Sequence, residues 1–444
     1  MVNAALKLLL PGRFLRLLHN RPDAKVLLKK KVVRDFFSIA GANLALKPIQ
    51  ILKGFLIAKY LGPAEYGILR AIELIPMLNK FGSLGFKTVA LREISSAMGR
   101  EDSAKAQLVR NNAYSCEFLL SVLLMVIGIV SSLFVESKTI AAAVIIASVG
   151  LFVAKVDGIF TTEANIQRSF RLFSRVILIA GFVNAIAVII TVPYAKIYAV
   201  LIFPILTTLL GIAIYLRKLK FSYRFSIDMP EFYRQVRIGL PMTLTTLSYG
   251  GYRYLERIFV GVYLGKVSLG FYGLAMMILS QLEVLFLYAV KVRKIQIFES
   301  LGAGKIREVR RLVRLETLLL TLTALLIVPV AWFGSDYVIR TFLPNYEGAI
   351  MACRLMAFAL PLKVFTSYIN IVIVSPYVNK QSVLPGMHVV QIAFLAIATL
   401  VLRHFGHLDL TTFVICDLLG YSIYHLGCYW VYKKNFLAKI RIEK

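Results

Sequence analysis

Lysine and arginine residues lie inside stretches of this chain that are otherwise apolar enough to cross a lipid bilayer. A cation in hydrocarbon costs at least about 2.5 kcal/mol, so it usually faces a water-filled cavity or a partner group. Carboxylates at comparable depth are fewer, so a cavity lined by these side chains would be net positive and would suit an anionic ligand. The cations are Lys47, Lys53, Arg70, Lys80, Lys87, Lys155, Arg253, Arg257, Arg354 and Lys363, and the carboxylates are Glu73, Asp157, Glu256, Glu283 and Asp417.

Some of these charged residues have a spacing that places them on one face of a helix. Arg70 and Glu73 are three residues apart, and Arg253, Glu256 and Arg257 fall at i, i+3 and i+4. Two interpretations stay open for these groups. They form structural ion pairs, with Glu256 neutralising an arginine, or they face a cavity that binds a ligand.

We predict a cationic binding cavity, because guanidinium groups hold phosphate oxygens in a bidentate fork and lysine acts as a point charge. The predicted binding residues are Lys47, Lys53, Arg70, Lys80, Arg253, Arg257 and Lys363. The carboxylates predicted to pair with these cations or to serve ion coupling are Glu73, Asp157, Glu256 and Glu283. The sequence predicts no catalytic residue, no metal centre and no cofactor, and leaves coupling to Na⁺ or H⁺ open.

The composition indicates a membrane protein. The chain is 59% hydrophobic, and apolar blocks of about 20 residues recur along it, a length that crosses the bilayer core as a helix. We therefore predict an all-α polytopic protein with about twelve transmembrane helices. The four cysteines lie in apolar surroundings without a CxxC pair, so no disulfide framework is expected.

The distribution of lysine and arginine in the connecting segments predicts the orientation. Most of these residues lie in segments predicted on the same side of the membrane as the N-terminus. Because lysine and arginine are enriched in cytoplasmic loops, we expect both termini in the cytoplasm and the protein in the cytoplasmic (inner) membrane. The net charge of +29 then lies beside lipid headgroups and needs no nucleic acid. The predicted divisions are a basic amphipathic segment at 1–35, a six-helix lobe at 36–216, a linker at 217–237, a six-helix lobe at 238–432 and a basic tail at 433–444.

An internal repeat links the two predicted lobes. Tyr60-Leu61-Gly62 followed by Gly67 recurs 203 residues later as Tyr263-Leu264-Gly265 followed by Gly270, and Gly99 recurs as Gly302. Each half would hold six spans, so both halves would have the same orientation and a pseudo-two-fold axis along the membrane normal. We expect a ligand site between such halves.

The segment from Lys59 to Gly67, together with Gly82-Ser83-Leu84-Gly85-Phe86 and Arg92-Glu93-Ile94, resembles the Wzx-like polysaccharide transporters of the MOP superfamily, which also contains MATE exporters. The resemblance implies the MATE-like fold of two six-helix lobes around a cationic lumen. It also implies a flippase, not an enzyme, that moves polyprenyl-pyrophosphate-linked oligosaccharide, such as an O-antigen repeat unit, to the outer leaflet.

Alternatives within transport are a lipid II flippase and a MATE-type ion-coupled exporter. The first predicted span holds Lys47 and Lys53 and no carboxylate, which argues against export of cationic compounds. A membrane glycosyltransferase or polymerase is a further alternative, but the predicted outer loops offer few acids. The expected partners of a monomer are the lipid-linked glycan, membrane lipids and other membrane proteins of polysaccharide assembly.

Overall fold

The computed structural model describes residues 31–76, 83–302, 304–375, 377–380 and 382–438, and these contain helices and no strands. Seven helical stretches among the described residues are long and apolar enough to cross a membrane. The predicted class of all-helical multi-pass membrane protein is confirmed, while the count of about twelve spans stays a prediction. Lys80 and the first 30 residues, which include most of the predicted amphipathic segment, lie outside the described residues.

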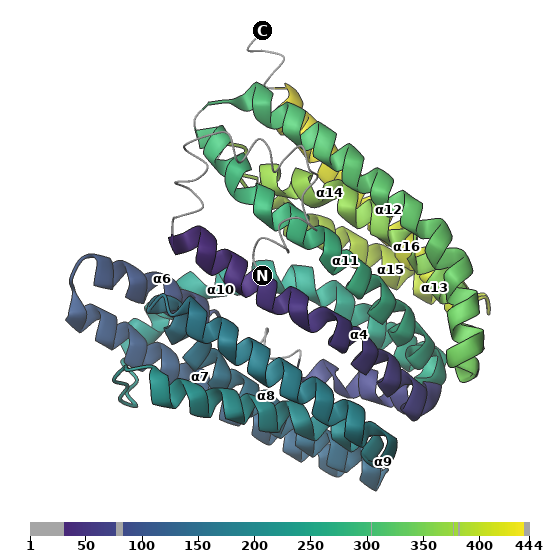
Figure 1. The fold of residues 1–444 in the computed structure, drawn as a ribbon, viewed down its shortest axis with the longest axis horizontal. Coiled ribbons are helices and arrows are strands. Elements are labelled where there is room, and N and C mark those ends of the chain that lie inside the picture. Colours follow the sequence, from purple (N-terminus) through teal and green to yellow (C-terminus); the bar gives the residue numbers. More distant parts are fainter. Residues whose placement is uncertain (1–30, 77–82, 303, 376, 381, 439–444) are drawn as a thin grey trace. The chain divides into compact units, whose positions relative to one another are not determined.

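Some helices contain two predicted spans each, because the connection between the spans is a kink. Helix α4 (Lys31–Ile72) is broken at Gly62, and helix α9 (Phe170–Lys218) is broken at Lys196, where φ is 46°. These connections are therefore bends within α4 and α9, both of which are labelled in Figure 1.

The chain forms two compact units that interleave in the sequence. Unit 1 takes residues 1–53, 82–135 and 145–239, and unit 2 takes residues 54–81, 136–144 and 240–444. The predicted lobe boundary at the linker 217–237 stays a prediction.

Unit 1 has a core of apolar side chains between its helices. Phe86 and Ile94 pack with Val109 and with Ile159, and Tyr215 packs with Val176 in a neighbouring cluster. The helices that supply this core are α6 (Phe86–Gly99), α7 (Ser103–Ser131), α8 (Lys138–Ile166), α9 and the start of α10 (Met229–Phe259). Unit 1 also contains the first part of α4.

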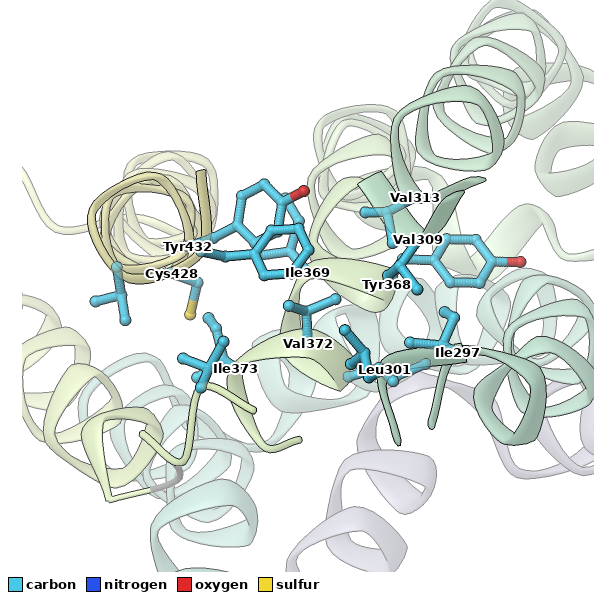
Figure 2. Packing of buried hydrophobic residues seen from close by; sticks show 14 of the residues in the cluster. Ile297, Leu301, Val309, Val313, Tyr368, Ile369, Val372, Ile373, Cys428 and Tyr432 are labelled. Carbon is cyan, nitrogen blue, oxygen red and sulfur yellow. The ribbon is translucent and has the colours of Figure 1, made fainter. Parts of the chain in front are cut away.

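Buried apolar side chains of unit 2 form a cluster that Figure 2 shows from close by. Ile297 and Val309 pack with Tyr368, Val372 and Tyr432, all of which are almost fully buried. Helix α14 lies against α11, α12 and α16, and α16 also packs on α15. These helices are α11 (Gly265–Gly302), α12 (Ile306–Phe342), α13 (Ile350–Met356), α14 (Ala359–Ile373), α15 (Val383–His404) and α16 (Leu410–Tyr432), with the π turns η2 (Val260–Leu264) and η4 (Lys433–Leu437) and the 3₁₀ turn η3 (Pro344–Ala349).

The two copies of the repeated motif share a backbone conformation. Gly62 has φ 70° and ψ 172°, and Gly265 has φ 83° and ψ 177°. This conformation is open to glycine and costly for other residues, which explains why each motif ends in glycine. The match at an offset of 203 residues supports the predicted internal repeat.

Candidate anion-binding site

Arg70 and Arg257 share the carboxylate of Glu73. Arg70 Nη1 lies 2.6 Å from Glu73 Oε2, and Arg257 Nη1 lies 3.5 Å from the same oxygen. Arg70 also donates a hydrogen bond to the hydroxyl of Tyr66, and its guanidinium stacks 4.4 Å from the Tyr66 ring centroid. The cluster Arg70–Glu73–Arg257, called triad A here, therefore holds two cations against one acid.

Arg253 and Lys363 share the carboxylate of Glu283 in the same way. Arg253 Nη2 lies 3.0 Å and Lys363 Nζ lies 3.4 Å from Glu283 Oε2. Lys363 also lies 4.6 Å from the ring centroid of Tyr421, a cation–π distance. This second cluster, Arg253–Glu283–Lys363, is called triad B.

Helix α10 joins the two triads, because Arg253 and Arg257 are one turn apart on one face. With every group ionised, each triad carries one excess positive charge. Arg253 is the most exposed of the six side chains, at 36%, whereas Glu283 is only 12% exposed. The more accessible charge of triad B is thus the positive one, as an anion site requires.

Glu256 lies on the same helix as these arginines. It is fully buried and accepts a hydrogen bond from the hydroxyl of Tyr421 at 2.9 Å. Asp417, also fully buried, accepts hydrogen bonds from Tyr252 and Tyr272. A tyrosine hydroxyl therefore reaches each of the two carboxyl groups, while Glu256 Oε2 is buried without a hydrogen-bond partner among the described residues.

A pocket of about 190 Å³ lies beside triad B within unit 2. Triad B forms its charged end, and the side chains of Tyr252 and Tyr421 form part of its wall. Among the described residues, neither Glu256 nor Asp417 lines it. The remaining lining residues are Leu287, Val290, Thr366, Ser367, Asn370, His388, Gln391, Tyr424 and His425.

Unit 1 contains its own group of charged residues. Glu117 is buried and contacts Lys155 Nζ at 3.0 Å and Lys87 Nζ at 3.3 Å. Asp157 lines a separate cavity of about 370 Å³. Lys53 donates to Asn184 Oδ1 at 2.9 Å, and Lys47 is half-buried. The predicted binding residues of unit 1 are therefore described apart from the triads.

The sequence analysis missed two kinds of residue. Glu117 and Glu163 are fully buried carboxylates that the sequence analysis did not single out. The uncharged polar residues of the pocket were also missed. Their signal was a helical spacing of polar groups within apolar spans, such as Thr366 with Asn370 and His388 with Gln391.

Solved structures with this fold are transporters. The chain matches an inward-facing multidrug resistance MATE family transporter of the MOP superfamily with a TM-score of 0.68 and 14% identity over 88% of this chain and 95% of that one. It matches the outward-facing form of such a transporter with a TM-score of 0.60 and 14% identity over 93% and 98%. A MOP superfamily transporter from Pyrococcus furiosus, described as having a binding pocket of reversed polarity, matches with a TM-score of 0.62 and 14% identity over 92% and 97%.

These likenesses show that the chain has the fold of the MOP superfamily. None of the curated protein sequences compared with the chain matches it significantly. The model of a protein family described as "Polysaccharide biosynthesis protein" matches residues 32–292, which is more than half of the chain. This multi-pass membrane protein therefore belongs to the polysaccharide biosynthesis protein family.

Proposed function

We propose that this protein is a flippase that moves a polyprenyl-pyrophosphate-linked oligosaccharide from the inner to the outer leaflet of the cytoplasmic membrane. The observation that supports this proposal most directly is the stoichiometry of the triads, in which two cations share one carboxylate. A diphosphate group supplies the missing negative charge. The family match to polysaccharide biosynthesis proteins supports the glycan part of the substrate.

The chemistry of the triads suits phosphate oxygens. Arg253 and Arg257 each carry a planar guanidinium that can bind a phosphate through two parallel hydrogen bonds, whereas both terminal nitrogens of Arg70 already contact Glu73 and Tyr66. Lys363 adds a compact ammonium that can follow a moving oxygen. Lys47 and Lys53 of unit 1, and Lys80, stay predicted members of the same binding site.

Translocation in this proposal involves no covalent chemistry. The headgroup binds to the cations from the cytoplasmic leaflet, the isoprenoid tail stays in lipid, and the site then opens to the other side by alternating access. Glu73, Asp157, Glu256 and Glu283 stay the predicted carboxylates for charge pairing or for coupling to Na⁺ or H⁺.

The same triads disfavour an exporter of cationic compounds, because two excess positive charges would repel its substrate. A lipid II flippase also handles a diphosphate, so the headgroup sugar must separate it from the proposed function. The fold occurs in a transporter described as having a binding pocket of reversed polarity, so this fold does not fix the polarity of the pocket.

The test is a flip assay in proteoliposomes with a fluorescent polyprenyl-pyrophosphate-linked oligosaccharide. We expect Arg253→Ala and Lys363→Ala to reduce the rate of flipping by about tenfold or more, since each removes a charge-assisted contact. Arg354→Ala is the matched control, because Arg354 is a partly buried arginine of unit 2 that pairs with Asp336, outside both triads. Equal rates in wild type and both triad variants would overturn the assignment.

A further inference from the structure

Helix α12 carries arginines and leucines along one exposed line. Arg307, Arg311 and Arg314 are exposed and fall at i, i+4 and i+7, so they follow one another along the helix surface and are called the arginine line here. Leu318 and Leu322 continue this line at i+11 and i+15 and are 54% and 48% exposed. Buried side chains on another face of α12 pack against α14, so the line itself lies on the surface of unit 2.

The length of the apolar part of α12 sets the depth of the arginine line in a bilayer. No charged residue occurs from Thr317 to Ser335, a stretch of roughly 19 residues or about 28 Å, which matches the hydrocarbon core of ~30 Å. At the far end of this stretch Phe333 and Tyr337 are 72% and 67% exposed, as aromatic residues at a membrane interface are. The arginine line begins just beyond the opposite end, at the depth of the lipid headgroups.

Within the described residues, none of the three arginines of this line forms an ion pair. Glu316, the nearest acid on the apolar side, lies 2.6 Å from Arg293 instead. Glu308 is exposed on the same helix, and Arg310 adds a further exposed cation beside the line. Even with Glu308 counted against one arginine, the arginine line keeps two uncompensated positive charges.

The arginine line lowers the stability of α12 when no anion is bound. Arg311 repels both Arg307 and Arg314, because like charges three or four residues apart on a helix are neighbours. Helix α12 begins at Ile306, so the charge of Arg307 also adds to the partial positive charge of the helix N-terminus. A bound anion would relieve both repulsions.

An anionic phospholipid matches the whole line and not only its charge. Its phosphate lies at headgroup depth and accepts two parallel hydrogen bonds from one guanidinium. Its acyl chain lies along Leu318 and Leu322, which a soluble anion would leave uncovered. A second copy of the chain is a poorer match, because it would bring its own arginines against these arginines.

We propose that the arginine line, together with Leu318 and Leu322, binds an anionic phospholipid of the phosphatidylglycerol class. The lipid stabilises the folded protein, because the unfolded chain does not present the arginines and leucines in one line. This inference goes beyond the proposed function, since it concerns the outer surface of α12 and no residue of either triad.

The experiment follows the full-length protein in a neutral detergent with added phosphatidylglycerol, or with phosphatidylcholine of the same acyl chains. Native mass spectrometry measures the affinity of the most tightly bound lipid, and thermal unfolding measures its effect on stability. We expect wild type to prefer phosphatidylglycerol by about tenfold, because each basic residue near a membrane surface favours an anionic lipid by about fivefold. Phosphatidylglycerol should also raise the unfolding temperature more than phosphatidylcholine does.

The test variant combines Arg311→Gln with Arg314→Gln. Without added lipid it should unfold at the wild-type temperature or above it, because the repulsion along the helix is removed. Its preference for phosphatidylglycerol should fall below about threefold. Arg340→Gln is the matched control, because Arg340 is an exposed arginine at the other end of α12 that pairs with Asp336 at 3.1 Å. This control should keep the wild-type preference.

Each contrary outcome assigns the surface differently. Equal binding of the two lipids to wild type overturns the proposal, and so does an undiminished preference in the double variant. If inorganic phosphate raises the unfolding temperature as much as phosphatidylglycerol does, the site needs no lipid and the proposal fails. A wild-type dimer that becomes monomeric in Leu322→Gln would assign this surface to a second copy of the chain instead.

Discussion

Gly67 and Gly270 make reciprocal contacts with the chain around each other. A Cβ atom on Gly67 would collide with the backbone carbonyl of Lys266, and a Cβ atom on Gly270 would collide with the backbone carbonyl of Pro63. The two glycines are 203 residues apart, and so are Pro63 and Lys266. The repeated motifs therefore pack on each other as a two-fold pair does, in which the same surface serves both partners.

This packing predicts that alanine at either glycine destabilises the protein. Both residues are helical, so intrinsic propensity alone would favour alanine by up to about 1 kcal/mol. The collision with a backbone carbonyl cannot be relieved by a side-chain rotation, and we expect a loss of about 1–3 kcal/mol. Thermal unfolding in detergent measures the effect.

Gly251→Ala is the control for these variants, because Gly251 is also helical but has open space around its Cβ position. It should unfold at the wild-type temperature or slightly above. If Gly67→Ala and Gly270→Ala behave as this control does, the close packing of the two motifs is contradicted.

Triad A predicts that replacing Glu73 alone lowers the stability of the protein more than replacing Glu73 together with Arg257. Glu73→Gln leaves Arg70 and Arg257 as neighbouring like charges, and we expect a loss of about 1–2 kcal/mol. Glu73→Gln combined with Arg257→Gln removes that repulsion and should recover part of the stability. A double-mutant cycle of unfolding free energies measures the coupling, and strictly additive values would contradict it.

The buried cluster of unit 1 predicts an asymmetry between its members. Glu117→Gln leaves Lys155, which is fully buried, without a carboxylate, and we expect a loss of about 3–5 kcal/mol. Lys155→Met should be milder, because Glu117 keeps its contact with Lys87 at 3.3 Å. Unfolding temperatures of the two variants decide the order, and a milder effect of Glu117→Gln would refute it.

Glu231 predicts a pH dependence of stability in unit 1. Burial acts to raise the pKa of Glu231, but hydrogen bonds from Arg234 and Gln235 outweigh it and lower the pKa below its ordinary value. The stabilisation is therefore fully present above about pH 5 and is lost as the pH falls through the lowered pKa. Arg234 is partly exposed, so the effect should be under about 1 kcal/mol.

The measurement for this prediction is the unfolding temperature at pH 7 and at pH 4 for wild type and Glu231→Gln. The variant should be less stable than wild type at pH 7 and closer to it at pH 4. A constant difference between the two proteins across this range would exclude the linkage.

The sequence was sufficient for the class of fold because apolar blocks of membrane-spanning length cannot be accommodated otherwise. It also placed Arg70 and Glu73 on one helix face with an ion pair as one of two interpretations, and the structure has these residues 2.6 Å apart. The sequence could not predict that Arg257 also contacts the carboxylate of Glu73. Arg257 and Glu73 are 184 positions apart and meet only through helix packing.

The uncharged part of the pocket was harder to predict for a different reason. Asn370, Gln391 and His425 come from separate helices, and single polar residues in apolar spans more often serve helix packing than ligand binding. Their convergence becomes visible only when buried atoms without partners are found in one cavity.

The sharing of one acid by two bases has a consequence for passage through the bilayer. Triads A and B together carry two uncompensated charges, and a diphosphate diester carries two of the opposite sign. The loaded protein would then be locally electroneutral, whereas the empty protein would not. Reorientation through a medium of low dielectric constant is easier for the neutral form, so the charge count itself could favour movement of the loaded carrier over the empty one.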